Sequence, residues 1–389
     1  MKKIYLDNGA TTMVDPAVVK EMLPFFSDVY GNPSSIHQKG QEAKRYLTEA
    51  REDVAKKLNA GYDEIIFTSG GTESDNLAIK GVAYANRDKG NHIITTKIEH
   101  PAVLNTCKAL EKEGFEIKYL GVDNEGFVIL DDLRKAITPK TLLVSIIHGN
   151  NEIGTIQPLE KIGNICREHG VMFHTDAVQS FTKVPINAKK VPVDLISMSS
   201  HKIHGPKGVG ALYVRKGTKM ASIQHGGAHE FKLRAGTENV PGIMGFAKAV
   251  KLSSDSDAKR IAKLRDRLIS GIEKEIHDVK LNGPRGEKRL CNNVNIAFAN
   301  VEGEALGSYL DVSGICTSTG SACSSHSLEP SHVLLAIGLD KGLANGTLRM
   351  TLSRFTTEEE IDYTIGSLKK YVEKLRKISP LKRVLKDVL

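Results

Sequence analysis

A lysine with hydroxyl and imidazole neighbours stands near the middle of the chain. The run Ser199 to Lys202 follows an apolar, strand-like stretch, Asp194 to Met198, and precedes a glycine-rich turn that includes Gly205-Pro206-Lys207-Gly208. A lysine held at a strand end among such groups can form a Schiff base with a carbonyl cofactor such as pyridoxal phosphate. An ordinary solvated lysine is the alternative reading, because polar loops lie on the surface. The segment alone does not decide between the two.

A second candidate is the glycine turn Thr68 to Ser74, which follows the apolar residues Ile65 to Phe67. A turn of this kind that opens a helix presents free backbone N–H groups and the positive end of the helix dipole, which together suit a phosphate. A plain helix cap explains the same letters equally well, since Ser or Thr followed by Glu commonly begins a helix.

Two further polar groups follow predicted strands. Asp176 comes directly after Val171 to Thr175, where its carboxylate could pair with a protonated pyridine nitrogen, although a helix-capping role is the commoner use. His100 stands before Pro101, the predicted first turn of a helix, where an isolated histidine is more often structural. Each of these four groups has an ordinary explanation when taken alone. Their joint occurrence at four strand ends, each suited to the same cofactor, is much harder to explain by chance.

The elements that must position these groups alternate between strand and helix. Short apolar runs predict seven strands, at residues 64–68, 92–96, 116–120, 141–147, 171–175, 194–198 and 211–214. Helix-length segments at 73–89, 101–113, 130–136 and 159–169 lie between several of them. This alternation predicts an α/β fold with a mainly parallel seven-stranded sheet between helices. Ligands of such sheets collect where strand ends meet loops.

The pattern changes after Gly236. One long helix is predicted from Asn239 through Glu275, followed by a strand at Val294 to Phe298, a glycine-spaced loop and a terminal helix at 357–377. We therefore expect a large domain at 15–255 and a smaller α+β domain formed by 1–14 and 256–389.

Composition narrows the class of protein. The chain has 389 residues, of which 40% are hydrophobic and 26% charged, as in an ordinary soluble globular protein. A net charge of +8 favours acidic partners or an anionic cofactor, but it is spread along the chain without a nucleic-acid-binding module. No apolar run is long enough to span a membrane, and Asp7 and Asn8 interrupt any signal peptide. We expect a cytoplasmic protein that binds neither nucleic acid nor membrane.

Cysteine and histidine spacing argues against a resident metal. The five cysteines are scattered without CxxC spacing, so a disulfide framework or a zinc site is not expected. Two glycines separate His225 from His229, which is unsuited to a metal-binding helix. The basic run 369–386 is interpreted as the solvated face of a terminal helix, with partner docking as the weaker alternative.

Motifs along nearly the whole chain carry a family resemblance. In order and spacing the chain resembles the cysteine desulfurases of the NifS and IscS type, within the fold-type I pyridoxal phosphate enzymes. The matching motifs are Tyr5 to Thr12, Gly31 to Ser35, Gly71 to Ser74, Glu99-His100, Asn150 to Gly154, Asp176 to Gln179, Ser199 to Lys202, Arg234 to Thr237, Gly320 to Cys323 and Leu348-Arg349.

The resemblance implies a role for each site residue. Lys202 is the lysine that binds the cofactor, Asp176 the partner of its ring nitrogen, and His100 the group that stacks on the ring and assists proton transfer. The remaining residues implied to bind pyridoxal phosphate are Gly71, Thr72, Asn151, Gln179, Ser199, Ser200, His201 and Thr237. Thr237 is implied to complete the phosphate cup of the opposite subunit of a homodimer. Asn151 and Arg349 are implied to hold the substrate, and the planar fork of Arg349 suits a carboxylate.

Cys323 is the residue that specifies the reaction. It lies among small polar residues, Ser318 to Ser327, whereas Cys107, Cys166 and Cys291 are predicted to be inert and buried and Cys316 to be structural. The resemblance implies that L-cysteine yields L-alanine and a Cys323 persulfide. That sulfur is implied to pass to an iron-sulfur scaffold protein or another acceptor, with thiolation of transfer RNA as a further use. Cys323 is also a candidate transient iron-sulfur ligand.

Two alternative functions remain open from the sequence. A selenocysteine lyase or an aminotransferase would keep the fold and cofactor, but a transaminase needs no such thiol. A scaffold that docks partners without catalysis would be expected to lose cofactor groups, yet Lys202, Asp176, Gln179 and His100 are all present.

Overall fold

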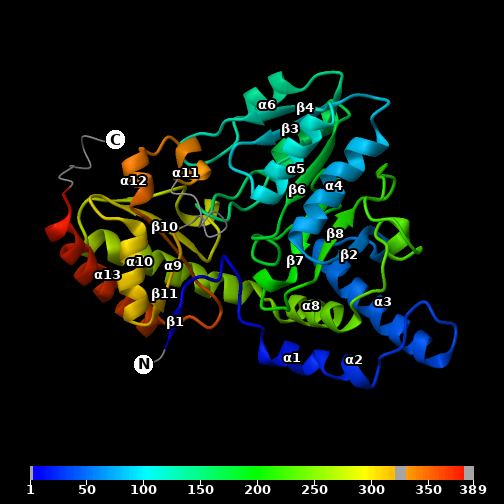
Figure 1. Ribbon diagram of the computed structural model, residues 1–389, viewed down its shortest axis with the longest axis horizontal. Helices are drawn as coiled ribbons and strands as arrows, with labels where there is room; N and C mark the ends of the chain where they lie inside the picture. The colour runs from blue at the N-terminus through cyan, green and yellow to red at the C-terminus, as the bar shows by residue number, and fades with distance from the viewer. Residues whose placement is uncertain (1–2, 320–329, 381–389) are drawn as a thin grey trace.

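The computed structural model describes residues 3–319 and 330–380, and Figure 1 shows two lobes side by side. The lobe that contains most of the first half of the chain is built on a seven-stranded sheet of order β2-β8-β7-β6-β5-β3-β4. Its strands are β2 Ile65–Thr68, β3 His92–Thr96, β4 Glu116–Leu120, β5 Thr141–Ser145, β6 Met172–Asp176, β7 Leu195–Ser199 and β8 Gly210–Val214. Each strand lies within two residues of the prediction at both ends, so the α/β fold class is confirmed.

One strand of the sheet runs against the others. β8 pairs antiparallel with both β2 and β7, while the pairs among β7, β6, β5, β3 and β4 are parallel. Only ten residues, 200–209, separate β7 from β8, which is too few for the helical crossover that a parallel neighbour requires. The segment that makes this short return carries Lys202.

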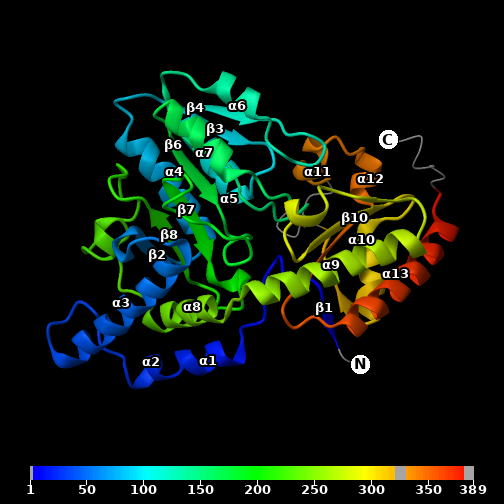
Figure 2. The same cartoon turned by 180° about the vertical axis from the view of Figure 1, so that it is seen from behind.

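Helices cover both faces of the large sheet, as Figures 1 and 2 show from opposite sides. Successive residues of β2 point to opposite faces of the sheet. Ile65 and Phe67 pack with α3 and α8 on one face, whereas Ile66 packs with α4 and α5 on the other. The helices of this lobe are α1 Pro16–Met22, α2 Pro24–Ser27, α3 Gln38–Leu58, α4 Gly71–Ala85, α5 Pro101–Lys112, α6 Leu130–Ala136, α7 Leu159–Glu168 and α8 Val240–Leu252.

The second lobe has a three-stranded antiparallel sheet of order β12-β10-β9 and a two-stranded parallel pair, β1 with β11. The strands are β1 Ile4–Tyr5, β9 Val279–Leu281, β10 Asn293–Phe298, β11 Ile315–Cys316 and β12 Thr347–Thr351. The helices are α9 Asp255–Glu275, α10 Gly303–Val312, α11 His332–Ala336, α12 Lys341–Asn345 and α13 Glu358–Ile378. Its apolar core lies between the sheet and α9, α10 and α13.

The single helix predicted from Asn239 through Glu275 is wrong: the structure has two helices, α8 and α9. Ser253 adopts an extended conformation, and Ser254 accepts a hydrogen bond from the backbone N–H of Asp257 as the N-cap of α9. A side chain that caps a new helix competes with continuation of the old one. The break lies close to the expected boundary at residue 255, which supports a domain division that stays a prediction.

No helix in the described part of the chain is long and apolar enough to cross a membrane. Cys107, Cys166 and Cys291 are buried, as predicted.

Candidate active site

The site lies at the carboxyl ends of the central strands. Asp176 is the last residue of β6 and Ser199 the last of β7, and these two strands are neighbours near the middle of the sheet. Lys202 follows in the 3₁₀ turn Ser200–Lys202, and the turn before α4 follows β2. Because parallel strands deliver their ends to one edge of a sheet, residues far apart in sequence lie together there.

Lys202 reaches across to the N-terminal segment. Its Nζ donates hydrogen bonds to the backbone carbonyls of Gly9 and Ala10, each at 2.7 Å. Gln179 donates from Nε2 to the same Gly9 carbonyl at 2.8 Å. The N-terminal segment therefore holds the lysine and the glutamine side by side.

Asp176 supplies the buried charge of the site. Its side chain is 4% exposed, and one carboxylate oxygen accepts a hydrogen bond from the Val178 N–H at 2.9 Å. Burial raises the pKa of Asp176 to about 6, while the hydrogen bond from Val178 and the Lys202 ammonium oppose the rise. A carboxylate at this position can pair with a cationic ring nitrogen.

His100 is the N-cap of α5. Its Nδ1 accepts a hydrogen bond from the Ala102 N–H at 3.1 Å, so this nitrogen carries no proton. Burial, followed by the charges of Lys202 and His332, lowers the pKa of His100 to about 4. The neutral ring suits stacking, and only its Nε2 remains to carry or exchange a proton.

Two serines predicted to bind the cofactor have unsatisfied hydroxyls. The Oγ atoms of Ser199 and Ser200 are buried and make no hydrogen bond to the described residues. Helix α4 begins at Gly71 without a side-chain cap, and a Cβ on Gly71 would approach Cγ2 of Val178 to 2.6 Å. Free backbone donors and an unpartnered hydroxyl beside a helix N-terminus fit a phosphate group. The residues present therefore fit pyridoxal phosphate.

Three further predicted site residues are not buried. His201 places Nδ1 3.1 Å from the Thr11 hydroxyl, so its ring contacts the N-terminal segment that also holds Lys202. Thr72 follows Gly71 in the first turn of α4 and is exposed. Thr237 is exposed and lines a cavity with Thr68 and Ser69 of the glycine turn. Cys323 lies outside the described residues.

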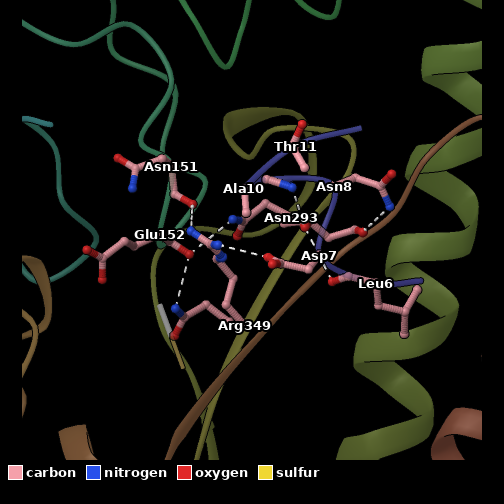
Figure 3. Close-up of polar contacts among 12 residues, drawn as sticks. Leu6, Asp7, Asn8, Ala10, Thr11, Asn151, Glu152, Asn293 and Arg349 are labelled. Carbon is pink, nitrogen blue, oxygen red and sulfur yellow. Dashed lines mark hydrogen bonds and ion pairs between the residues drawn. The ribbon is translucent and has the colours of Figure 1, made fainter. Parts of the chain in front are cut away.

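Arg349 is held in position by the polypeptide around it, as Figure 3 shows. Its Nη2 forms an ion pair with Asp7 at 3.0 Å, and Nη1 donates to the Asn151 carbonyl at 3.1 Å. The Arg349 Nε and the Asn151 Oδ1 are buried without a hydrogen-bond partner among the described residues. One unsatisfied donor from strand β12 and one unsatisfied acceptor from the turn at Asn151 suit a substrate with a carboxylate and an amino group.

Four contributors to the site were not predicted from the sequence: Asp7, Gly9, Ala10 and Glu99. The first three belong to the family motif Tyr5 to Thr12 and the last to Glu99-His100, but the motifs alone imply no role for them. Glu99 is fully buried; its Oε1 accepts hydrogen bonds from the Thr96 hydroxyl at 2.6 Å and the Ile147 N–H at 3.0 Å. Burial raises the pKa of Glu99 to about 8, despite those hydrogen bonds. No sequence signal distinguishes it from an exposed glutamate beside a helix.

Comparisons with known proteins find matches along nearly the whole chain. The family model described as "Aminotransferase class-V" matches residues 4–364. The chain is 54% identical to a cysteine desulfurase IscS of Dictyoglomus turgidum, with 98% of each chain covered. It is 53% identical to a cysteine desulfurase IscS of Methanosarcina thermophila, covering 98% of this chain and 94% of the relative.

Solved structures are similar over the same length. A NifS-like protein superposes with a TM-score of 0.90 at 41% identity, covering 96% of this chain and all (100%) of the other. The structure of "SspA in complex with cysteine" superposes with a TM-score of 0.82 at 38% identity, covering 91% of this chain and 100% of that one.

Proposed function

The chain belongs to the class V aminotransferase family, and on that premise we propose that it is a cysteine desulfurase. The enzyme removes sulfur from L-cysteine, releases L-alanine and retains the sulfur as a persulfide for iron-sulfur cluster assembly. The observation that carries this proposal is that Lys202 and Arg349 both contact residues 7–10 and that Asp176 lies near enough to Lys202 for their charges to interact. The chain is also 54% identical to a cysteine desulfurase along almost its full length.

Pyridoxal phosphate is the cofactor that these residues would hold. Lys202 would bind it covalently, Asp176 would face its ring nitrogen, and Ser199 with the turn at Gly71 and Thr72 would receive its phosphate. Once bound, the group withdraws electrons from the α-carbon of an amino acid.

Substrate binding falls to Arg349 and Asn151. Asp7 and the Asn151 carbonyl fix the Arg349 guanidinium before substrate arrives, so little conformational entropy is lost when a carboxylate binds. An Arg349 held in one orientation would fix the carboxylate of L-cysteine in one position.

Proton transfer falls to Lys202 and His100. The carbonyls of Gly9 and Ala10 hold the Lys202 amine when it is not bonded to the cofactor, which keeps the amine close to the α-carbon as a base. His100, neutral at physiological pH, offers Nε2 as the second proton-transfer atom.

The sulfur leaves through Cys323. Its thiolate attacks the sulfur of L-cysteine, an S–S bond forms and the C–S bond breaks. The electron pair of that bond goes to the β-carbon, which takes up a proton to give alanine. Overall, L-cysteine and an enzyme thiol become L-alanine and an enzyme persulfide, so atoms and electrons balance.

We further infer a homodimer, with Thr237 of each subunit completing the other's phosphate cup, and delivery of the persulfide sulfur to a scaffold protein in the cytoplasm. The exposure of Thr237 on its own chain supports the first inference. The domain division at residues 14/15 and 255/256 is part of the same proposal.

The test is a product assay with a thiol-specific control. Wild-type protein with L-cysteine and a reductant should release sulfide and alanine in equal amounts, and Cys323→Ala should lose sulfide release by at least a hundredfold. Cys316→Ala removes a partly exposed thiol of the second lobe and should retain the wild-type rate. Sulfide release at the wild-type rate by Cys323→Ala contradicts the proposal.

A further inference from the structure

A short segment before Thr237 has an unusual backbone. Glu230, Phe231 and Lys232 have φ angles of 42°, 54° and 67°, so three successive residues with side chains occupy the left-handed region. Each would avoid this region in a free chain, because Cβ crowds the backbone there. Surrounding contacts must therefore hold the segment in place.

The first of those contacts is a buried ion pair. Both carboxylate oxygens of Glu230 accept hydrogen bonds from Arg51 of α3, at 2.6 and 2.7 Å, and one also accepts from the Phe67 N–H of β2 at 2.8 Å. Glu230 and Arg51 are 5% and 6% exposed. The Arg51 guanidinium lies over the rings of Phe67 and Phe231, at 4.6 and 5.1 Å from their centroids. These contacts attach Glu230 and Phe231 to Phe67, the residue that precedes the glycine turn.

A second contact lies on the other side of that turn. Arg234 donates from Nε to one Glu73 oxygen at 2.8 Å, and the other Glu73 oxygen accepts from the Ser69 N–H at 2.8 Å. Glu73 belongs to the first turn of α4, while Ser69 belongs to the glycine turn. Arg234 therefore ties the segment to the predicted phosphate-binding turn through a single carboxylate.

Both contacts act on residues 229–237, here named the strap. We propose that Arg51, Glu230, Arg234 and Glu73 are positioning residues that make the shape of the phosphate turn and the placement of Thr237 depend on each other. The inference rests on the proposed function, in which Thr237 enters the partner subunit's site. Its consequence is that cofactor retention and subunit association are coupled through the strap: loosening it speeds cofactor release and subunit exchange together.

The experiment uses the holoenzyme and measures two rates. Pyridoxal phosphate release is followed by loss of cofactor absorbance in the presence of a trap, and subunit exchange by native mass spectrometry of mixed light and heavy-isotope populations. Arg234→Gln and Glu73→Gln, which break the partly exposed contact, should each raise both rates at least tenfold. The charge-swapped double variant Arg234→Glu with Glu73→Arg should return both rates toward wild type. Glu230→Gln should also raise both rates at least tenfold. If that buried variant fails to fold, the Arg234→Gln and Glu73→Gln variants decide whether the coupling exists.

Two control variants separate the strap from general destabilisation. Arg134→Gln breaks an exposed ion pair with Glu168, 2.7 Å long and remote from the strap, and should leave both rates within twofold of wild type. Lys232→Gly keeps both contacts and relieves the backbone, so its rates should also stay within twofold. Unchanged rates in Arg234→Gln, or faster cofactor release without faster subunit exchange, overturn the coupling. Sulfide and alanine formation by wild-type protein tests the desulfurase activity separately, so the two failures are distinguishable.

Discussion

Arg349 has two of its three nitrogen atoms committed within the protein. Asp7 and the Asn151 carbonyl occupy Nη2 and Nη1, while Nε is buried without a partner among the described residues. An unpaired donor in a buried place is costly, because it has lost water without gaining a hydrogen bond. A bound carboxylate would give the Arg349 Nε a hydrogen-bond partner and remove that cost. Relief of this cost would therefore contribute to the binding free energy of the substrate.

We therefore expect Arg349→Lys to raise the KM for L-cysteine by about 10–100-fold, since hydrogen bonds to charged groups contribute about 1.5–3 kcal/mol and a lysine cannot reproduce the fork. Steady-state alanine formation gives KM and kcat separately. Arg376→Lys, at a site on α13 where an arginine also donates to backbone carbonyls, is the matched control and should leave KM unchanged. An Arg349→Lys variant with wild-type KM contradicts the role.

Glu99 gives the fold a pH dependence. With its pKa raised to about 8 by burial, the folded protein keeps a proton on this carboxyl that the unfolded chain loses near pH 4.5. Its contribution to stability is full below that lower value and is lost as pH rises through about 8.

Glu99→Gln keeps a neutral hydrogen-bond acceptor and cannot ionise. Its free energy of unfolding should therefore fall less as pH rises. We expect the free energy of unfolding of wild type to fall by on the order of 2 kcal/mol more than that of the variant between pH 5 and pH 8.5. Urea denaturation of the apoprotein at several pH values measures the difference. Glu168→Gln, at an exposed carboxyl, is the control, and parallel curves for wild type and Glu99→Gln would refute the assignment.

Lys202 and Asp176 could be proposed from the sequence because each follows an apolar strand, whereas a role for Gln179 came only from the family resemblance. The Gly9 and Ala10 carbonyls that hold Lys202 could not, because every residue has a carbonyl group. Only a contact spanning 193 positions identifies the one at Gly9. Likewise, the burial of Glu99 depends on packing that no local pattern records.

At the scale of elements, the strands were predictable and the junction of α8 and α9 was not. Most strands of the large sheet are buried, short and nearly continuous apolar runs, and β4 alternates between apolar and polar residues, so the sequence shows all seven. In contrast, Ser253 and Ser254 interrupt a stretch whose other residues suit a helix, and only the hydrogen bond from Asp257 N–H to Ser254 decides that a new helix begins. The 21-residue helix α3 was missing from the predicted elements, since its charged residues obscure its narrow apolar face.

Helix α13 has a complete capping box. The Thr357 hydroxyl accepts from the Glu360 N–H at 3.3 Å, and the Glu360 carboxylate accepts from the Thr357 N–H at 3.2 Å. Because α13 packs along α9 in the core of the second lobe, fraying at this end would loosen both helices.

Thr357→Ala should lower the free energy of unfolding by about 1 kcal/mol, as typical for loss of an N-cap. Thermal unfolding monitored by circular dichroism measures the change. Thr48→Ala removes a hydroxyl from the middle of α3 that bonds only to its own helix, and should change stability by less than about 0.5 kcal/mol. Equal losses in the two variants would show that capping is not the cause.

At the scale of the molecule, the proposed placement of Thr237 can be tested by mixing subunits. If Thr237 acts in the partner's site, a heterodimer of Lys202→Ala and Thr237→Ala chains contains one site with Lys202 and Thr237 both intact. Mixing should therefore restore a wild-type site in each heterodimer, and the pyridoxal phosphate affinity of that site should return to the wild-type value. Sulfide release after subunit exchange, together with cofactor titration, measures the recovery. If Thr237 acts in its own chain, no mixture exceeds the activity of the Thr237→Ala parent.

Subunit arrangement lay beyond the sequence for a physical reason. Apolar periodicity reports which residues a chain buries within itself, whereas an exposed threonine in a polar loop has the same pattern with or without a partner. Only the family resemblance assigned Thr237 to a second subunit.

The pairing of β1 with β11 sets an order of events during protein synthesis. Ile4 pairs with Ile315, and Gly9 donates to the Thr351 hydroxyl, so residues 4–9 can form these contacts only after residues 315–351 have been translated. The strands of the large sheet are all translated by residue 214 and can pair earlier, since domains generally fold as units during translation. The carbonyls that hold Lys202 arrive only when the N-terminal segment is fastened. A chain that stops before residue 315 can therefore build the large sheet but cannot fasten the carbonyls that hold Lys202.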